Sequence, residues 1–287
     1  MNMKNQQYIY LFLLYALLAA CKKELNPVVI EAGTAGKINY YSTSVVIPQY
    51  DVKLFGTSVS INNDVPKTNF TSEYPTVIGQ KTPVYASYPI GSITSTFTLM
   101  KTTDVALPDI AYAKTNADLS FDNKTLVYFI DGPVQEQVKP AFTVVNMQQP
   151  EAPKTEAGKI NIRILNASPD AGELGVALVK PDGTEDGTNF PKELAYGKFT
   201  DEIAISSENV QSNNLLKLKI TDKNGTLLFY AGLSGEEQHG YTLIIKGFKQ
   251  AHTLSIPQSL STDGNKTVIY APFNFPRSLS ANIRQIY

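Results

Sequence analysis

An internal repeat constrains the fold of this chain more than any other feature of its sequence. The pentapeptide Ala-Gly-Lys-Ile-Asn occupies residues 35–39 and returns unchanged at residues 157–161, 122 residues later. A second pair of similar segments lies further along each half. The apolar run at 125–130 resembles the run at 242–246, which begins 117 residues later. Two collinear matches with similar offsets indicate a tandem duplication. The fold must therefore be one that two related halves of about 105 to 110 residues each adopt.

Both halves show the alternation that is typical of half-buried β-strands. In residues 160–164 and 216–220, aliphatic residues alternate with polar ones, so one face is buried and the other meets water. Asn224-Gly225 separates two such runs and favours the positive φ of a tight hairpin turn. Beyond the N-terminal segment, no sustained window places apolar residues at helical spacing. We therefore predict an all-β fold with two tandem immunoglobulin-like β-sandwich domains.

Polar segments that contain proline suggest the domain boundaries. Residues 147–156 include Pro150 and Pro153 and offer almost nothing to bury, which is typical of a semi-extended linker. The predicted organisation is a signal peptide at 1–20, a tether at 21–35, a first sandwich at 36–146, the linker at 147–156, a second sandwich at 157–262 and a C-terminal tail at 263–287. The tail has no counterpart in the first half. We expect it to add an edge strand or to cross the interface between the domains.

The only cysteine follows a segment that is typical of a signal peptide. Lys4 lies in a polar start, and the apolar stretch 8–18 has about 11 residues, whereas a membrane-spanning helix needs about 20. Leu18-Ala19-Ala20-Cys21 resembles the lipobox of bacterial lipoproteins, in which the cysteine thiol receives diacylglycerol. This resemblance implies lipidation of Cys21 and a soluble body held at a membrane by its N-terminal lipid. A small buried cysteine is the alternative.

The residues after the cysteine bear on localisation. Lys22-Lys23-Glu24 follow it, and in the Bacteroidetes-type lipoproteins that this chain resembles, charges at this place influence export to the outer surface. We expect an anchor in the outer membrane of the cell envelope, with the body facing the periplasm or the surface. A solvated tether without such a signal is the alternative.

A turn motif follows the first strand of the second half. Residues 166–171 read Asn-Ala-Ser-Pro-Asp-Ala after an alternating strand, which resembles the opening of the domain-of-unknown-function family 4397 (DUF4397), found in secreted and lipid-anchored bacterial proteins. The likeness extends to about residue 259, whereas Tyr-Tyr-Ser-Thr-Ser replaces the motif at 40–44. The resemblance implies a β-sandwich outside the cytoplasm and assigns no catalytic residue. Because Asn, Ser and Asp hydrogen-bond nearby backbone amides, we expect a turn-forming role rather than a ligand contact.

Composition excludes several classes of function. The net charge is −1 and the isoelectric point is about 6.2, which gives no basic footprint for nucleic acid. One cysteine and two histidines leave little for a zinc site or a catalytic triad. His239 and His252 have no carboxylate close in sequence to orient them, so we expect both to be exposed. For the acidic segment 181–187 we prefer hairpin turns over a calcium site. We therefore predict no enzymatic activity, cofactor or metal.

Tyrosine is abundant in the first half. We expect most of these residues to be half-buried in strands, and one or two of Tyr74, Tyr85 and Tyr88, which lie near prolines, to be on exposed loops. Exposed rings there would stack on a sugar or anchor a protein. The sequence thus predicts a lipid-anchored, non-catalytic binding module for a glycan or a protein. The alternative is a structural or accessory subunit of an outer-membrane assembly.

Overall fold

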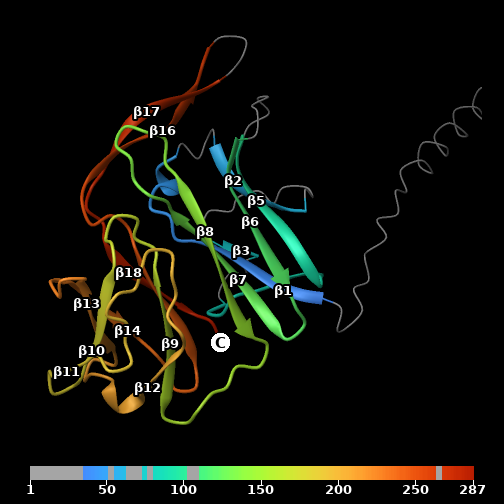
Figure 1. The fold of residues 1–287 in the computed structure, drawn as a ribbon. Coiled ribbons are helices and arrows are strands. Elements are labelled where there is room, and N and C mark those ends of the chain that lie inside the picture. Colours follow the sequence, from blue (N-terminus) through green and yellow to red (C-terminus); the bar gives the residue numbers. More distant parts are fainter. Residues whose placement is uncertain (1–34, 51–54, 63–72, 76–79, 102–109, 263–266) are drawn as a thin grey trace, which may run out of the picture. The chain divides into compact units, whose positions relative to one another are not determined.

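Strands make up almost all the regular structure in the described part of the chain, as Figure 1 shows. The computed structural model describes residues 35–50, 55–62, 73–75, 80–101, 110–262 and 267–287. Two short 3-10 turns, Ile47–Gln49 and Ser207–Asn209, also lie within these ranges. None of the described segments is a helix long and apolar enough to cross a membrane. The predicted all-β sandwich fold is confirmed.

The first half forms two sheets that face each other. Its strands are β1 (Ala35–Ser42), β2 (Phe55–Ile61), β3 (Glu73–Tyr74), β4 (Ala86–Pro89), β5 (Gly91–Lys101), β6 (Ile110–Leu119), β7 (Asn123–Asp131) and β8 (Phe142–Pro150). The order β3-β1-β7-β8, with β4 also paired to β1, defines the first inner sheet. The order β2-β5-β6 defines the first outer sheet.

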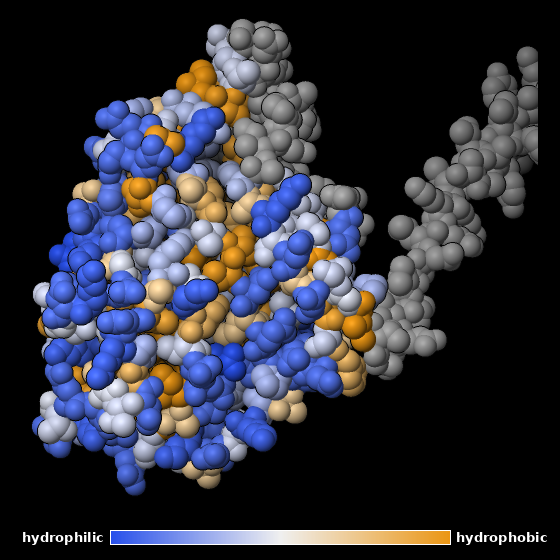
Figure 2. Space-filling model, in the orientation of Figure 1, coloured by the Kyte–Doolittle hydropathy of each residue, from blue (hydrophilic) through white to orange (hydrophobic). Residues whose placement is uncertain are grey.

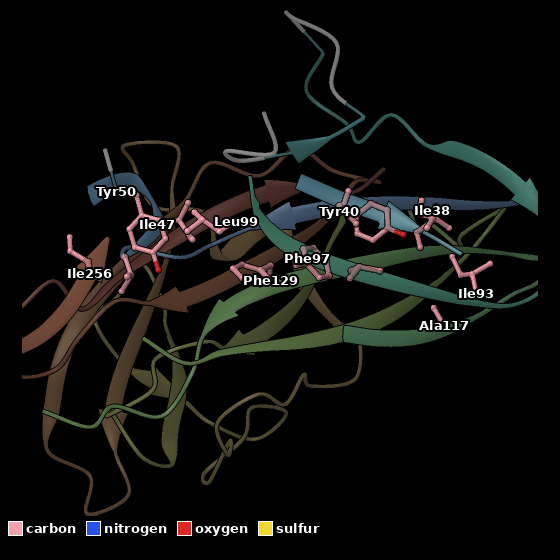
Figure 3. Close-up of a cluster of buried hydrophobic side chains, with 14 of the residues drawn as sticks. Ile38, Tyr40, Ile47, Tyr50, Ile93, Phe97, Leu99, Ala117, Phe129 and Ile256 are labelled. Atoms are coloured by element: carbon pink, nitrogen blue, oxygen red, sulfur yellow. The ribbon is translucent and has the colours of Figure 1, made fainter. Parts of the chain in front are cut away.

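Aliphatic and aromatic side chains fill the space between these two sheets, which we call the first core (Figure 3). The ring centroid of Phe97 on β5 lies 4.9 Å from that of Phe129 on β7 and 5.8 Å from that of Tyr40 on β1. The Tyr40 hydroxyl is hydrogen-bonded to the Ser95 hydroxyl at 2.7 Å, so this buried polar group has a partner. The alternation of polar and apolar residues along β5 follows from this packing, since only one of its faces meets the core.

The second half repeats this two-sheet arrangement. Its strands are β9 (Lys159–Asn166), β10 (Leu174–Val179), β11 (Glu185–Asp186), β12 (Ile203–Ser206), β13 (Leu216–Asp222), β14 (Leu227–Leu233), β15 (Gly240–Lys246), β16 (His252–Leu260), β17 (Val268–Phe275) and β18 (Ser280–Gln285). The order β12-β9-β15-β18 defines the second inner sheet, and β11-β10-β13-β14 the second outer sheet. Aliphatic side chains from both sheets form the second core between them.

A third cluster, the central core, joins the two inner sheets. Leu126, Tyr128 and Ile130 of β7 pack there with Leu165 of β9 and Ile244 of β15. The remaining apolar residues of β7 face the first core, so this strand is buried on both faces. Strands buried on both faces have continuous rather than alternating apolar runs. This explains why the two late runs at 125–130 and 242–245 are apolar at nearly every position.

The duplication predicted from the sequence corresponds to a shared topology. In each half, the strand that carries the repeated pentapeptide pairs in parallel with the late apolar strand, β1 with β7 and β9 with β15. The late strands, however, are not in the register that the sequence match suggests. Thr125 lies opposite Ile38, whereas Thr242 lies opposite Arg163, three positions beyond the equivalent Ile160. A shift by an odd number of residues exchanges the two faces of a strand. Thr125 is therefore on the first-core face of β7, and Thr242 is on the central-core face of β15.

The C-terminal strands belong to both halves. β16 and β17 form an antiparallel hairpin, and Leu254, Ile256 and Phe275 from this hairpin pack into the first core. β18 pairs with β15 and completes the second inner sheet. The described residues accordingly fall in one compact unit, Gly33–Tyr287.

The segment predicted as a linker begins inside a strand. β8 pairs with β7 as far as Pro150, which lies opposite Asn123. Met147 is buried in the central core. Residues 147–150 of the predicted linker are therefore part of β8. Only the residues after Pro150 connect the halves without regular structure up to Lys159.

Candidate functional site

The three tyrosines predicted as ligand contacts lie in two different cores. Tyr74 on β3 and Tyr88 on β4 are half-buried against the first core, and the ring centroid of Tyr74 lies 6.4 Å from that of Tyr40. Tyr85 is half-buried against the central core, with the Lys124 ammonium 5.6 Å from its ring centroid. Burial raises the pKa of the Tyr85 hydroxyl. The structure does not bring these rings together into one exposed aromatic surface. Cys21 lies outside the described residues.

His252, the first residue of β16, lies between two carboxylates. Its Nδ1 is 2.6 Å from a carboxylate oxygen of Glu136, and its Nε2 is 2.8 Å from one of Asp170. Burial lowers the pKa of the imidazole, but the hydrogen bonds to Asp170 and Glu136 outweigh it, so the pKa is raised above 6.5. The expectation that His239 and His252 are exposed is wrong, since His239 is half-buried and the His252 side chain is only 14% exposed, with carboxylates on both of its ring nitrogens. The signal was missed because the two acids are 82 and 116 residues away in sequence.

The geometry around His252 is that of a structural junction. Both ring nitrogens face carboxylates, so neither is free to accept a proton from a nucleophile. Glu136 also accepts a hydrogen bond from the Thr253 backbone amide at 2.8 Å. The imidazole therefore ties a loop of the first half to a turn of the second half. His239 is half-buried, with Nδ1 2.8 Å from the Glu237 carbonyl oxygen.

The turn motif positions the second of these carboxylates. Asp170 accepts backbone hydrogen bonds from Lys249 at 2.7 Å and from Gln250 at 2.9 Å. The Ser168 hydroxyl donates to the Gly247 carbonyl at 2.7 Å. The Ser168 amide donates to the Asn166 side chain at 3.2 Å, and the Ser168 hydroxyl lies 3.3 Å from an Asp170 carboxylate oxygen, so the local contacts expected from the sequence are also present. The motif is thus structural, and its hydrogen bonds act both within its own turn and across about 80 residues.

The acidic segment 181–187 contains the hairpin turn after β10 and the short strand β11, and each carboxylate is held by its own partner. Asp182 accepts hydrogen bonds from the backbone and hydroxyl of Thr184, which lower its pKa. Asp186 accepts the backbone hydrogen bond of Thr188 and pairs with Lys180 at 3.2 Å, and these contacts lower its pKa to about 2. Among the described residues, no three acidic, histidine or cysteine side chains are grouped as metal ligands. The preferred turn interpretation therefore accounts for this segment.

A groove of about 620 Å³ lies on the outward face of the second outer sheet. Gly175 and Ala177 of β10 line it with almost no side chain, and Lys219 and Thr221 of β13 lie beside them in register. The loop after β11 forms the opposite side. The remaining lining residues are Val176, Glu185, Gly187, Thr188, Pro191, Lys192, Asp222, Lys223 and Gly225. Figure 2 shows a largely hydrophilic surface over β10, β11 and β13, at the lower left.

Local packing keeps this groove open. A β-carbon at Gly175 would lie 2.5 Å from the Thr221 hydroxyl oxygen and 3.3 Å from the Lys192 carbonyl oxygen, so a side chain here would displace the Thr221 side chain. Lys219 reaches across β10 and places its ammonium 2.9 Å from both carboxylate oxygens of Glu185. Ala177, the partner of Lys219 in the sheet, is small enough to leave room for that ion pair. A volume in this range is typical of sites for small ligands.

The charges in the groove do not cancel. Asp222 accepts backbone hydrogen bonds from Asn224 and Thr226, both at 3.0 Å, and has the Lys249 ammonium at 3.7 Å. Both acidic groups of the groove, Glu185 and Asp222, are thus already neutralised. Lys192 and Lys223 are exposed, and among the described residues neither has a carboxylate within 4.0 Å.

Sequence reasoning missed this groove. Its residues come from β10, β11, β13 and two turns, and nothing in their spacing indicates that they meet. The available signal was the row of small outward residues on β10, Gly175 and Ala177, opposite the lysine-rich alternation of β13. A small residue on an outward strand position indicates that another group approaches the backbone closely.

Comparisons with known proteins add little to this geometry. No family model matches the chain, and no curated protein matches it. Among solved structures, the chain is similar to one described as a "putative cell adhesion protein" from Bacteroides fragilis NCTC 9343, at 9% sequence identity and a TM-score of 0.19. That match covers 86% of this chain and 99% of the other. At such a TM-score the likeness supports no conclusion about fold or function.

Proposed function

We propose that this chain is a non-catalytic binding protein of the bacterial cell envelope, held at the outer membrane by a lipid on Cys21. Its ligand site is the groove on the second outer sheet. The observation that supports this best is the lining of the groove, which presents hydroxyl, ammonium and carboxylate groups on a hydrogen-bonded sheet. Side chains fixed on strands bind with less loss of conformational entropy than side chains on loops.

The sequence supports the envelope location. The lipobox-like Leu18–Cys21 and the short apolar stretch before it predict the anchor. The turn motif at 166–171 and the strand before it resemble DUF4397, a family of secreted and lipid-anchored proteins. Both resemblances favour a protein outside the cytoplasm.

Two measurements test the anchor and the binding separately. For the anchor, Cys21→Ala is compared with the wild type by membrane fractionation and by mass spectrometry of the N-terminus. We expect the variant to leave the membrane fraction and to lack acyl chains. If it remains bound to membranes as the wild type does, the lipid anchor is refuted.

For the binding, the full chain in detergent is screened on a glycan array and cross-linked in the native envelope. Gly187→Phe serves as the blocking variant, because a β-carbon at Gly187 meets no atom within 4 Å and its ring would occupy the groove. We expect the variant to lose the array signal. An array without signal, combined with one cross-linked membrane partner that Gly187→Phe still captures, would instead support the accessory-subunit alternative.

A further inference from the structure

The groove offers enough unpaired positive charge to define the class of its ligand. We infer that it binds an acidic saccharide, a chain of sugars that bear carboxylates such as uronic acids. This inference rests on the proposed function, since it specifies the ligand of the same site. Three observations support it: the unpaired lysines, the fixed ion pair and the location of the groove on the face of a sheet.

The first observation is the charge that remains after internal pairing. Glu185 is neutralised by Lys219, and Asp222 by Lys249 and two backbone amides. Lys192 and Lys223 lie on the groove, and the described residues provide neither with an acidic partner. Two uncompensated ammonium groups attract an anion and repel a cation. The ligand is therefore expected to carry negative charge.

The second observation is the ion pair between Lys219 and Glu185. Its donor and acceptor atoms are held 2.9 Å apart across β10. A fixed donor next to a fixed acceptor matches neighbouring hydroxyl groups, each of which both donates and accepts a hydrogen bond. The hydroxyls of Thr188 and Thr221 add two further groups of this kind to the lining. A ligand with several hydroxyl groups satisfies these partners better than a simple anion does.

The third observation is the location of the groove on the face of a sheet. β10 is paired with β13 on one side and with β11 on the other, so its backbone groups are engaged. The Val176 amide also donates to the Pro191 carbonyl at 2.9 Å. A peptide that adds a strand needs an open sheet edge. Apart from Val176, Ala177 and Pro191, the lining residues are polar, charged or glycine. These features favour a saccharide over an acidic peptide.

The test measures binding of defined probes to the full chain in detergent by isothermal titration calorimetry. The probes are a trimer of galacturonic acid, its fully methyl-esterified form, which is neutral, and a hexamer of glutamic acid. We expect the acidic trimer to bind at least about tenfold more tightly than either other probe, and its affinity to fall as salt is raised, because exposed charges are screened.

Two variants link that binding to the groove. Lys192→Gln/Lys223→Gln should weaken binding of the acidic trimer at least about tenfold and reduce the salt dependence, since screening acts on these charges. The control Lys114→Gln/Lys154→Gln removes the same charge from exposed positions outside the groove and should bind as the wild type does. Gly187→Phe should abolish binding altogether.

Several outcomes would overturn the inference. Equal binding of the neutral ester, tighter binding of the glutamate hexamer, or no measurable binding of the trimer each refutes an acidic saccharide. If another probe binds instead, and Gly187→Phe abolishes that binding, the groove is still the ligand site. Only the acidic saccharide is then rejected as the class of ligand. If Gly187→Phe binds every probe as the wild type does, the groove itself is refuted.

Discussion

Asn166 shows how one buried side chain fixes the end of a strand in this fold. Its amide nitrogen donates to the carbonyl oxygens of Gly172 at 2.8 Å and Leu194 at 2.9 Å, and its oxygen accepts the Ser168 amide. The side chain is fully buried. It therefore joins the turn at 166–172, through Ser168 and Gly172, to the segment at Leu194, which also forms a β-bridge with Leu174. This explains the place of asparagine in the turn motif without a ligand.

Replacement of Asn166 by alanine should lower the free energy of unfolding by about 2 to 3 kcal/mol, because the three hydrogen bonds of its buried side chain are lost. Urea unfolding followed by circular dichroism measures the change. Asn189→Ala is the control, since Asn189 is exposed, and a surface change of this kind should stay within about 0.5 kcal/mol. Similar values for the two variants would contradict the role assigned to Asn166.

His252 makes stability depend on pH. Its folded pKa is raised above the ordinary value of 6.5, so its contribution to stability is fully present below pH 6.5 and is lost as the pH rises through the folded pKa. We expect the free energy of unfolding to fall between pH 6.5 and pH 9 in the wild type, and to fall less in His252→Gln. Denaturant unfolding at several pH values measures the difference between the two proteins.

Other titrating groups set the pH range of that comparison. Burial raises the pKa of Asp131 to about 6, so its contribution is present below pH 3.8 and is lost as the pH rises toward 6. The pKa of Glu136 is lowered by its hydrogen bond to His252, so its contribution is lost only at acidic pH. Above pH 6.5 the contributions of Asp131 and Glu136 to stability are therefore nearly constant. Parallel pH profiles of the wild type and His252→Gln in this range would show that the imidazole is not held as described.

At the scale of elements, the hairpin between β13 and β14 is the clearest success of sequence reasoning. The two strands pair as predicted, and Gly225 has a φ of 79°. The loop is a turn in which the Gly225 amide donates to the Asp222 carbonyl at 2.9 Å, and a bulge follows it. Only the glycine has a positive φ; Asn224 does not. The turn is thus the longer kind that ends in a left-handed residue.

Gly225→Ala should destabilise the protein by about 1 kcal/mol, because an L-residue is strained in the left-handed region. Gly187→Ala is the matched control. It changes the same residue type in a loop next to the same sheet, but Gly187 has no positive φ and no atom lies within 4 Å of a β-carbon there. Thermal unfolding of both variants tests the expectation, which fails if Gly187→Ala is the more destabilised of the two.

Alternation and turn residues were enough to predict strands, because these signals are local. The strands at 160–164 and 216–220 could be predicted because one face of each packs against the second core, which produces the alternation. The register of β15, the burial of Met147 and the carboxylates around His252 depend on partners far along the chain. The groove could not be predicted for the same reason. Its shape depends on register, which places Gly175 beside Thr221.

At the scale of the whole molecule, the two halves share their cores. The β16-β17 hairpin of the second half completes the first core, and the central core is built from both inner sheets. A polar contact adds to this connection, since the buried Arg284 on β18 hydrogen-bonds Glu73 and also Asn39, at 2.5 Å, and stacks over the Tyr41 ring at 4.3 Å. The second core is built from the second half alone, whereas the first core and the central core each need residues from both halves.

This shared packing predicts that the two halves unfold together. Ile244 on β15 is fully buried in the central core, so Ile244→Ala should cost about 2 to 5 kcal/mol by creating a cavity. If the halves are coupled, amide hydrogen exchange under conditions of global unfolding should accelerate to the same extent in β5–β6 of the first half as in β13–β14 of the second. Leu218→Ala, a cavity within the second core alone, should have the same coupled effect. Acceleration confined to β13–β14 in both variants would instead show that the halves unfold as independent domains, joined only by a contact that stabilises neither.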